Sequence, residues 1–136
     1  MRTIEVRGRV FSGEGVASQY ISIQWAREQI QQKLGFDPFP GTLNVRLKRA
    51  DSGRLKTAFE TSRGISLFPP RGYLSARCFQ VSVMSKIDGA IVIPEKQGYP
   101  PDILEIAAPV SLREHLSLRD GDEVEMAIFL DENPKV

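Results

Sequence analysis

Residues 40–47 of this 136-residue chain read Pro-Gly-Thr-Leu-Asn-Val-Arg-Leu. Proline and glycine predict a turn, and leucine, valine and leucine then alternate with the period of a β-strand. The same period places Thr42, Asn44 and Arg46 together on the opposite face. A hydroxyl and an amide oxygen suit a hard cation, and an arginine beside them suits a phosphate. The pattern therefore predicts a site for magnesium and a polyphosphate, although an ordinary edge strand with a polar outer face also explains it.

A second segment of interest, Gly13–Ser18, reads GEGVAS. Small residues let backbone N–H groups approach a ligand closely, and successive N–H donors in a tight turn form an anion-binding nest. The dinucleotide fingerprint is excluded because the third glycine is missing and Tyr20–Ile23 has the pattern of a strand. No Gly-Lys-Ser/Thr closes the segment, so it is not a P-loop. A plain hairpin loop between two strands is the simpler interpretation.

The composition is that of an ordinary globular domain, with 41% hydrophobic and 26% charged residues and a net charge of +1. We expect one domain over residues 1–136, in which residues 131–136 form a frayed tail. The near-neutral charge gives no argument for a nucleic-acid or membrane partner. The single cysteine, Cys78, excludes an internal disulfide and a cysteine-based zinc site, and its strand-like surroundings predict a packed thiol.

Neither a membrane span nor a secretion signal is expected. No segment reaches the ~18 consecutive apolar residues that a span needs, and the N-terminus lacks the apolar core of a signal peptide. We therefore expect a cytoplasmic protein, and we expect it to be a monomer.

Short strand-like segments dominate the rest of the chain. They fall at residues 3–11, 20–23, 42–47, 65–68, 73–84, 90–94, 103–107 and 124–130. Asp88 and Gly89 predict the hairpin turn before the strand at 90–94. The basic stretch from Lys48 onward, with no clear periodicity, predicts a solvated loop.

Two helices are expected among these strands. Gln24–Leu34 repeats its apolar residues with helical spacing, and Gly35 supplies a C-terminal stop. Ser111 and Glu114 have the spacing of a capping box and predict a short helix through Leu116. Seven or so strands with one substantial and one short helix predict a mainly β fold, a compact β-barrel.

Five segments stand in a characteristic order along the chain, namely Gly13–Gly15, Leu34–Asn44, Asp88–Pro94, Leu104–Leu116 and Asp120–Asp122. From about residue 6 to residue 130 they resemble the archaeal CTP-dependent riboflavin kinases. The most specific parts in combination are Pro-Gly-Thr-Leu-Asn and Leu-Arg-Glu-His-Leu. The resemblance implies a six-stranded cradle-loop β-barrel. It also implies magnesium-dependent transfer of the γ-phosphate of CTP to the 5′-hydroxyl of riboflavin, giving FMN and CDP.

The resemblance also implies a set of site residues. It assigns the magnesium ion (Mg2+) to Thr42 and Asn44, the pair that the strand period aligns. It assigns flavin contacts to Gln97 and Glu105, and Glu105 is the candidate general base because no other carboxylate is expected near the acceptor. His115 is expected at the surface. The implied nucleotide-binding residues are Gly13, Glu14, Gly15, Val16, Ala17, Ser18, Val110, Ser111, Leu112 and Arg113.

Three positions depart from the family pattern. The family usually has glycine and often a basic residue where this chain has Ala17 and Ser18, and threonine where it has Gln97. These departures favour an alternative function, a non-catalytic nucleotide- or flavin-binding barrel that acts as a sensor. A DNA-binding barrel regulator is a third class, and the absence of a basic surplus argues against it.

Overall fold

The computed structural model describes residues 2–13 and 16–131. Its strands and helices follow the order β1 (Arg2–Val10), α1 (Val16–Ile21), α2 (Gln24–Leu34), β2 (Leu43–Leu47), α3 (Arg49–Thr61), β3 (Ile65–Leu67), β4 (Ala76–Val83), β5 (Ile87–Pro94), β6 (Ile103–Ala107), α4 (Leu112–His115) and β7 (Glu123–Leu130). None of the helices described is long and apolar enough to span a membrane.

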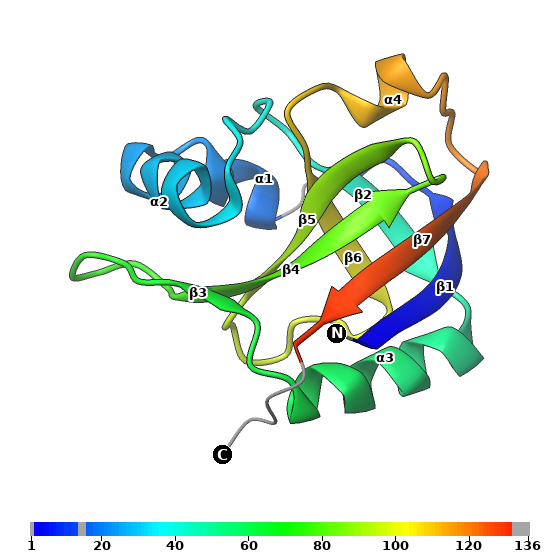
Figure 1. Ribbon diagram of the computed structural model, residues 1–136, viewed down its shortest axis with the longest axis horizontal. Coiled ribbons are helices and arrows are strands. Elements are labelled where there is room, and N and C mark those ends of the chain that lie inside the picture. Colours follow the sequence, from blue (N-terminus) through cyan, green and yellow to red (C-terminus); the bar gives the residue numbers. More distant parts are fainter. Residues whose placement is uncertain (1, 14–15, 132–136) are drawn as a thin grey trace.

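The strands close into an antiparallel barrel (Figure 1). Their order is β3-β4-β5-β6-β2-β1-β7, and β7 also pairs back with β4, where Val81 lies opposite Ile128. This closure gives a six-stranded barrel with β3 as an extra strand beside β4, and it confirms the predicted mainly β barrel. Closure satisfies strand edges that would otherwise recruit other chains.

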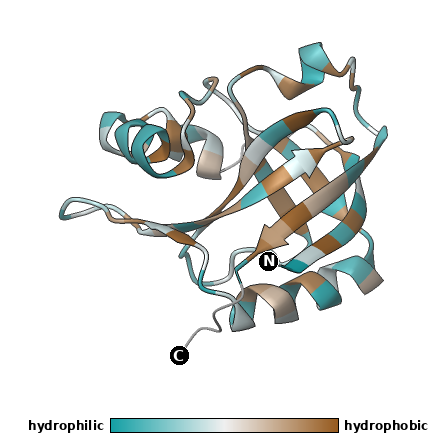
Figure 2. Cartoon of the chain, in the orientation of Figure 1, coloured by the Kyte–Doolittle hydropathy of each residue, from teal (hydrophilic) through white to brown (hydrophobic). Residues whose placement is uncertain are grey.

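Alternate residues of the strands fill the barrel, and hydrophobic and hydrophilic residues alternate along strands such as β1 (Figure 2). Helix α3 covers one end of the barrel (Figure 1). Leu43, Val45 and Leu47 of β2 point into this core, as the period of two predicts. From α3, Leu55 and Phe59 join the same core, where the Phe59 ring stacks on another aromatic ring at 4.3 Å. The polar residues Asn44 and Arg46 therefore lie on the opposite, outer face of β2.

A second hydrophobic core lies outside the barrel, where α1 and α2 pack against β3, β5 and β6. Helix α2 has the predicted bounds, and Gly35 ends it with φ 84°, donating its N–H to carbonyls of the last turn. Cys78 is fully buried in this core, as predicted for a packed thiol, and burial raises its pKa to about 12. Helices α1 and α2 therefore cover part of the outer face of the barrel.

Two predictions of local structure are wrong, because both segments carry apolar residues at helical spacing. Residues 20–21 end helix α1 rather than begin a strand, and Ala17, Tyr20 and Ile21 bury one face at the i, i+3, i+4 spacing. The expected solvated loop after Lys48 contains α3, whose apolar residues also follow this spacing while its basic residues face solvent. The described chain therefore has two substantial helices, not one, and two short ones.

The predicted Asp88–Gly89 turn is also wrong. The turn precedes it, at Met84 and Ser85, which adopt φ of 54° and 55°. Gly89 instead lies within β5, where an added Cβ would meet the carbonyl oxygen of Ala107 at 2.4 Å. Close approach of β5 and β6, and not a turn, explains this glycine.

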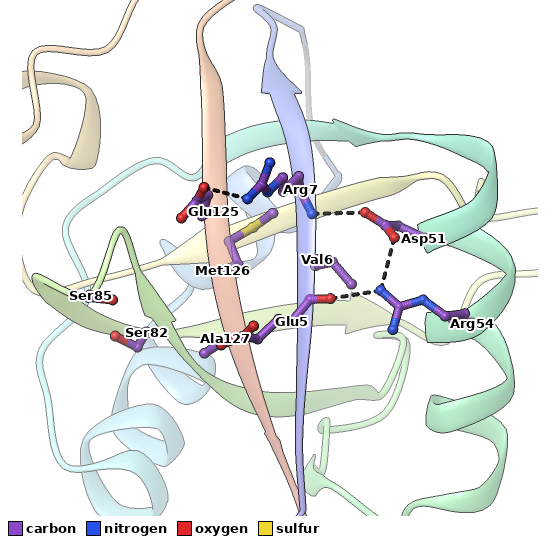
Figure 3. Close-up of a pocket in the computed structure, with 10 residues that line it drawn as sticks. All are labelled: Glu5, Val6, Arg7, Asp51, Arg54, Ser82, Ser85, Glu125, Met126 and Ala127. Atoms are coloured by element: carbon purple, nitrogen blue, oxygen red, sulfur yellow. Dashed lines mark hydrogen bonds and ion pairs between the residues drawn. The ribbon is translucent and has the colours of Figure 1, made fainter.

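Side chains of α3 cap the part of β1 that has no β2 partner (Figure 3). The β1–β2 pairing covers only residues 8–10. Beyond it, the N–H of Arg7 donates to Asp51 at 3.0 Å, and Arg54 donates to the carbonyl of Glu5 at 2.8 Å. Asp51 and Arg54 also pair with each other at 2.9 Å. The N–H of Arg7 and the Arg54 guanidinium lower the pKa of Asp51.

Replacement of this cap tests its contribution to stability. We expect Asp51→Ala to lower the free energy of unfolding by about 1–2 kcal/mol at neutral pH, because a charge-assisted hydrogen bond to the backbone is lost. Since folding lowers the pKa of Asp51, its contribution is present above its ordinary pKa and disappears as the pH falls through the lowered value. Urea unfolding should therefore show a difference that shrinks in acid. Glu60→Ala, on the exposed face of the same helix, is the control, and an equal effect of both variants would contradict the cap.

Candidate functional site

The pairing of β2 with β6 creates a polar patch on the outer face of the barrel. Asn44 lies directly opposite Glu105 in this antiparallel pair. Because their strand neighbours fill the barrel, both side chains point away from its core, Glu105 toward α1 and Asn44 toward Gly13. Asn44 is only 7% exposed and Glu105 only 1%. The edge-strand interpretation of β2 is therefore wrong, since β2 lies between two strands and its polar face is covered at Asn44.

Glu105 is the centre of a hydrogen-bond network. Both of its carboxylate oxygens accept the backbone N–H of Ala17, each at 3.1 Å. The hydroxyl of Tyr99 donates to Oε2, and that of Thr42 lies 3.4 Å from Oε1. Burial, followed by the hydrogen bond to Glu105, raises the pKa of Tyr99, so the phenol remains a donor. Residues from three distant segments thus meet at one buried carboxylate.

Thr42 and Asn44 bring two neutral oxygens together. The Oγ1 of Thr42 lies 3.2 Å from the Oδ1 of Asn44. The amide nitrogen of Asn44 donates to the carbonyl of Gly13 at 3.1 Å, which orients its oxygen toward Thr42. Two predicted metal ligands and one predicted nucleotide-binding residue are therefore neighbours.

Arg113 connects the second predicted nucleotide segment to the first. The Ser111 hydroxyl accepts the N–H of Glu114, as the capping box predicts, and thereby sets the start of α4. Arg113 donates to Asp120 at 2.5 Å and to Ser12 at 3.2 Å, next to Gly13. The Arg113 guanidinium, followed by the Ser12 hydroxyl, lowers the pKa of Asp120. A cation therefore stands beside the residue that begins the glycine-rich turn.

A small hollow of about 140 Å³ lies between Thr42 and the start of α4. It is lined by Phe39, Gly41, Thr42, Leu43, Ile106, Val110, Ser111, Leu112 and Arg113. A site that encloses a whole cofactor usually occupies roughly 300–1,000 Å³. The hollow formed by the described residues is smaller than such a site.

Gln97 is not part of this cluster. It lines a separate pocket of about 470 Å³ with residues of α3 and the loop after β5, and Glu105 does not line that pocket. Tyr99 takes part in both, because it lines the pocket and reaches Glu105 with its hydroxyl. The two predicted flavin contacts therefore do not line the same pocket. Of the remaining predicted residues, Glu14 and Gly15 lie outside the described part of the chain.

Several polar groups of this region escaped the sequence analysis. Tyr99 and Ser12 stand in segments with no periodic pattern, so only their long-range contacts reveal them. Tyr20 and Trp25 form an edge-to-face pair at 5.1 Å, and the Tyr20 hydroxyl and Trp25 Nε1 have no hydrogen-bond partner among the residues described. His115 is exposed on α4, as expected.

Known proteins resemble this chain over almost its full length. The family model named CTP-dep_RFKase, described as "Domain of unknown function DUF120", matches residues 10–128. A riboflavin kinase of Archaeoglobus fulgidus is 40% identical over 94% of this chain and 56% of its own length. The riboflavin kinases of Ignicoccus hospitalis and Pyrobaculum islandicum are each 42% identical, over 94% and 95% of this chain and over 73% and 62% of their own lengths. The chain thus spans little more than half of the Archaeoglobus protein. With a family model covering most of its residues, the chain belongs to the CTP-dep_RFKase family.

Proposed function

We propose that this chain is a CTP-dependent riboflavin kinase that transfers the γ-phosphate of CTP to the 5′-hydroxyl of riboflavin. The observation that carries the proposal is the meeting of Thr42, Asn44 and Gly13 beside the hollow at Val110–Arg113. Phosphoryl transfer needs a metal and a nucleotide cradle held in one geometry, with little covalent participation by the protein. The family name and the names of the relatives support the same reaction.

Thr42 and Asn44 are the residues proposed to hold magnesium. Neighbouring ligands of an octahedral Mg2+ ion lie about 2.9 Å apart, since each bond is about 2.0–2.1 Å long. The 3.2 Å between Oγ1 of Thr42 and Oδ1 of Asn44 fits such a pair after a small contraction. When bound, the ion neutralises phosphate charge, and neutral ligands leave most of its own charge available for that purpose.

The nucleotide is proposed to bridge the Gly13–Ser18 segment and the Val110–Arg113 segment. Arg113 supports this position because its guanidinium, which pairs with Asp120, also contacts Ser12 directly before the glycine-rich turn. The flavin is proposed to lie near Gln97 and Glu105, which Tyr99 connects. The features that favour a binding module as the alternative are Ala17, Ser18 and Gln97, and Gln97 lines a pocket that Glu105 does not line.

An assay of FMN formation tests the proposal directly. The protein would be incubated with riboflavin, magnesium and each of the four nucleoside triphosphates, and FMN would be separated and quantified. We expect FMN with CTP and little with the other three. A preference for another triphosphate would disprove the choice of donor. Binding of CDP and FMN without turnover would instead support the non-catalytic module.

Replacement of Asn44 tests the proposed metal pair. We expect Asn44→Ala to lower turnover at limiting magnesium by at least the roughly tenfold that loss of even an outer-shell partner costs a metal site. Because the side chain is buried and bonded to Gly13, we also expect a loss of about 1–2 kcal/mol in the free energy of unfolding.

For the unfolding measurement alone, Arg46→Ala is the control, because Arg46 lies on the same strand face with an exposed side chain. Its effect on unfolding should stay within about 0.5 kcal/mol. An unchanged magnesium dependence in Asn44→Ala would remove Asn44 from the metal site.

A further inference from the structure

Three side chains from distant segments form a closed triangle of hydrogen bonds beside the hollow. The hydroxyl of Ser12 donates to the carboxylate of Asp120 and lies 2.9 Å from each of its oxygens. The Nη2 of Arg113 donates to Oδ1 of Asp120 at 2.5 Å and to the Ser12 hydroxyl at 3.2 Å. Ser12 directly precedes Gly13, and Arg113 lines the hollow. The triangle therefore connects the two segments that are proposed to bind the nucleotide.

The turn that carries Asp120 is fastened to the end of β1 by its backbone. Within the turn, the N–H of Arg119 donates to the carboxylate of Asp122 at 2.8 Å, and the N–H of Asp122 donates to the carbonyl of Arg119 at 3.0 Å. Toward β1, Val10 accepts the N–H of Gly121 at 2.7 Å and donates its own N–H to the carbonyl of Asp122 at 2.9 Å. The carboxylate of Asp120 therefore projects from a fixed backbone.

Asp120 holds the guanidinium of Arg113 from outside the hollow. Arg113 lines the hollow together with Thr42, whereas Asp120 and Ser12 do not line it. Both contacts of the triangle use Nη2 of Arg113, so neither of them occupies Nη1 or Nε. A long arginine side chain loses rotamer freedom when it binds a ligand, and fixing it beforehand reduces that cost. The geometry suits a carboxylate that orients an arginine for a phosphate.

We propose that Asp120 is a positioning residue of the nucleotide site, which fixes Arg113 beside the glycine-rich turn and so joins the two halves of the site. The inference rests on the proposed function in requiring that a nucleotide binds between these segments. Asp120 acts through Arg113 and not through contact with the nucleotide. A carboxylate that only neutralised the arginine would weaken phosphate binding, so removal of its charge would then tighten binding. A positioning role has the opposite sign, and the two are distinguishable by experiment.

The simpler explanation of this contact is an ordinary surface ion pair. The side chains of Arg113 and Asp120 are 36% and 57% exposed, and such pairs contribute little to stability. The pair of Arg27 and Asp37 offers a direct comparison, because its atoms lie 2.9 Å apart and Asp37 is also 57% exposed. That pair takes no part in the triangle. Loss of either carboxylate should therefore have little effect on folding, and only the loss of Asp120 should weaken nucleotide binding.

The test is a calorimetric titration with CDP in the presence of magnesium. In Asp120→Asn an amide oxygen can still accept the Ser12 hydroxyl, but the charge that holds Arg113 is lost. We expect its affinity for CDP to fall about three- to tenfold. Asp37→Asn is the matched control, and its affinity should stay within about twofold of the wild-type value. The midpoint of thermal unfolding should stay within about 3 °C of wild type in both variants.

A double-mutant cycle with Arg113→Ala separates a positioning role from an independent one. If Asp120 acts through Arg113, Asp120→Asn should change the affinity for CDP by less than about twofold once Arg113 is absent. An equal loss of affinity with and without Arg113 would overturn the inference. Unchanged or tighter binding of CDP by the single variant Asp120→Asn would also overturn it, and the proposed nucleotide site would remain intact.

Steady-state kinetics supply a second readout that a merely structural role would not move. In Asp120→Asn the KM for CTP should rise by the same three- to tenfold factor, whereas the KM for riboflavin should stay at the wild-type value. An equal rise in both KM values would contradict a role confined to the nucleotide. Binding of CDP that depends on Asp120, in a protein that forms no FMN, would disprove the kinase and retain the positioning role. Absence of CDP binding by the wild-type protein would overturn both.

Discussion

The antiparallel register between β2 and β6 is the constraint on which the candidate site depends. It places Asn44 opposite Glu105 on the outer face while Leu43 and Val45 fill the barrel. A slip by one residue would turn the carboxylate into the hydrophobic core and the leucine out of it. The packing requirement of the core therefore holds the polar oxygens of the site in place, although none of them belongs to that core.

The barrel supplies the rigid floor of the site, and segments far apart in sequence supply the rest. The turn before α1 contributes the carbonyl of Gly13, and α1 contributes the N–H of Ala17. The loop after β5 contributes Tyr99, and the start of α4 contributes Arg113. This arrangement is typical of functional sites, in which a stable scaffold positions groups carried by loops. The second hydrophobic core, between these helices and the strands, holds α1 and α2 against the barrel.

Local patterns predicted those features that depend on neighbouring residues. Helix α2 and its Gly35 stop, the Ser111 cap and the two faces of β2 all follow from short-range periodicity or capping chemistry. Helices α1 and α3 are exceptions, because α1 is only six residues long and the apolar residues of α3 stand among charged and polar ones. The turn was misplaced because Gly89 serves a close approach between strands that no local pattern can show.

By itself, the sequence determined the mainly β barrel and the shared face of Thr42 and Asn44, because both follow from the alternation of apolar and polar residues. It also determined the family, because the motifs occur in a characteristic order. Only the tertiary structure decided the burial of Glu105, its contacts with Ala17 and Tyr99, and the pocket that Gln97 lines with Tyr99. These depend on where distant segments cross the barrel. Ala17 and Glu105 are 88 residues apart, and their contact arises from the packing of α1 over β6 rather than from any local preference.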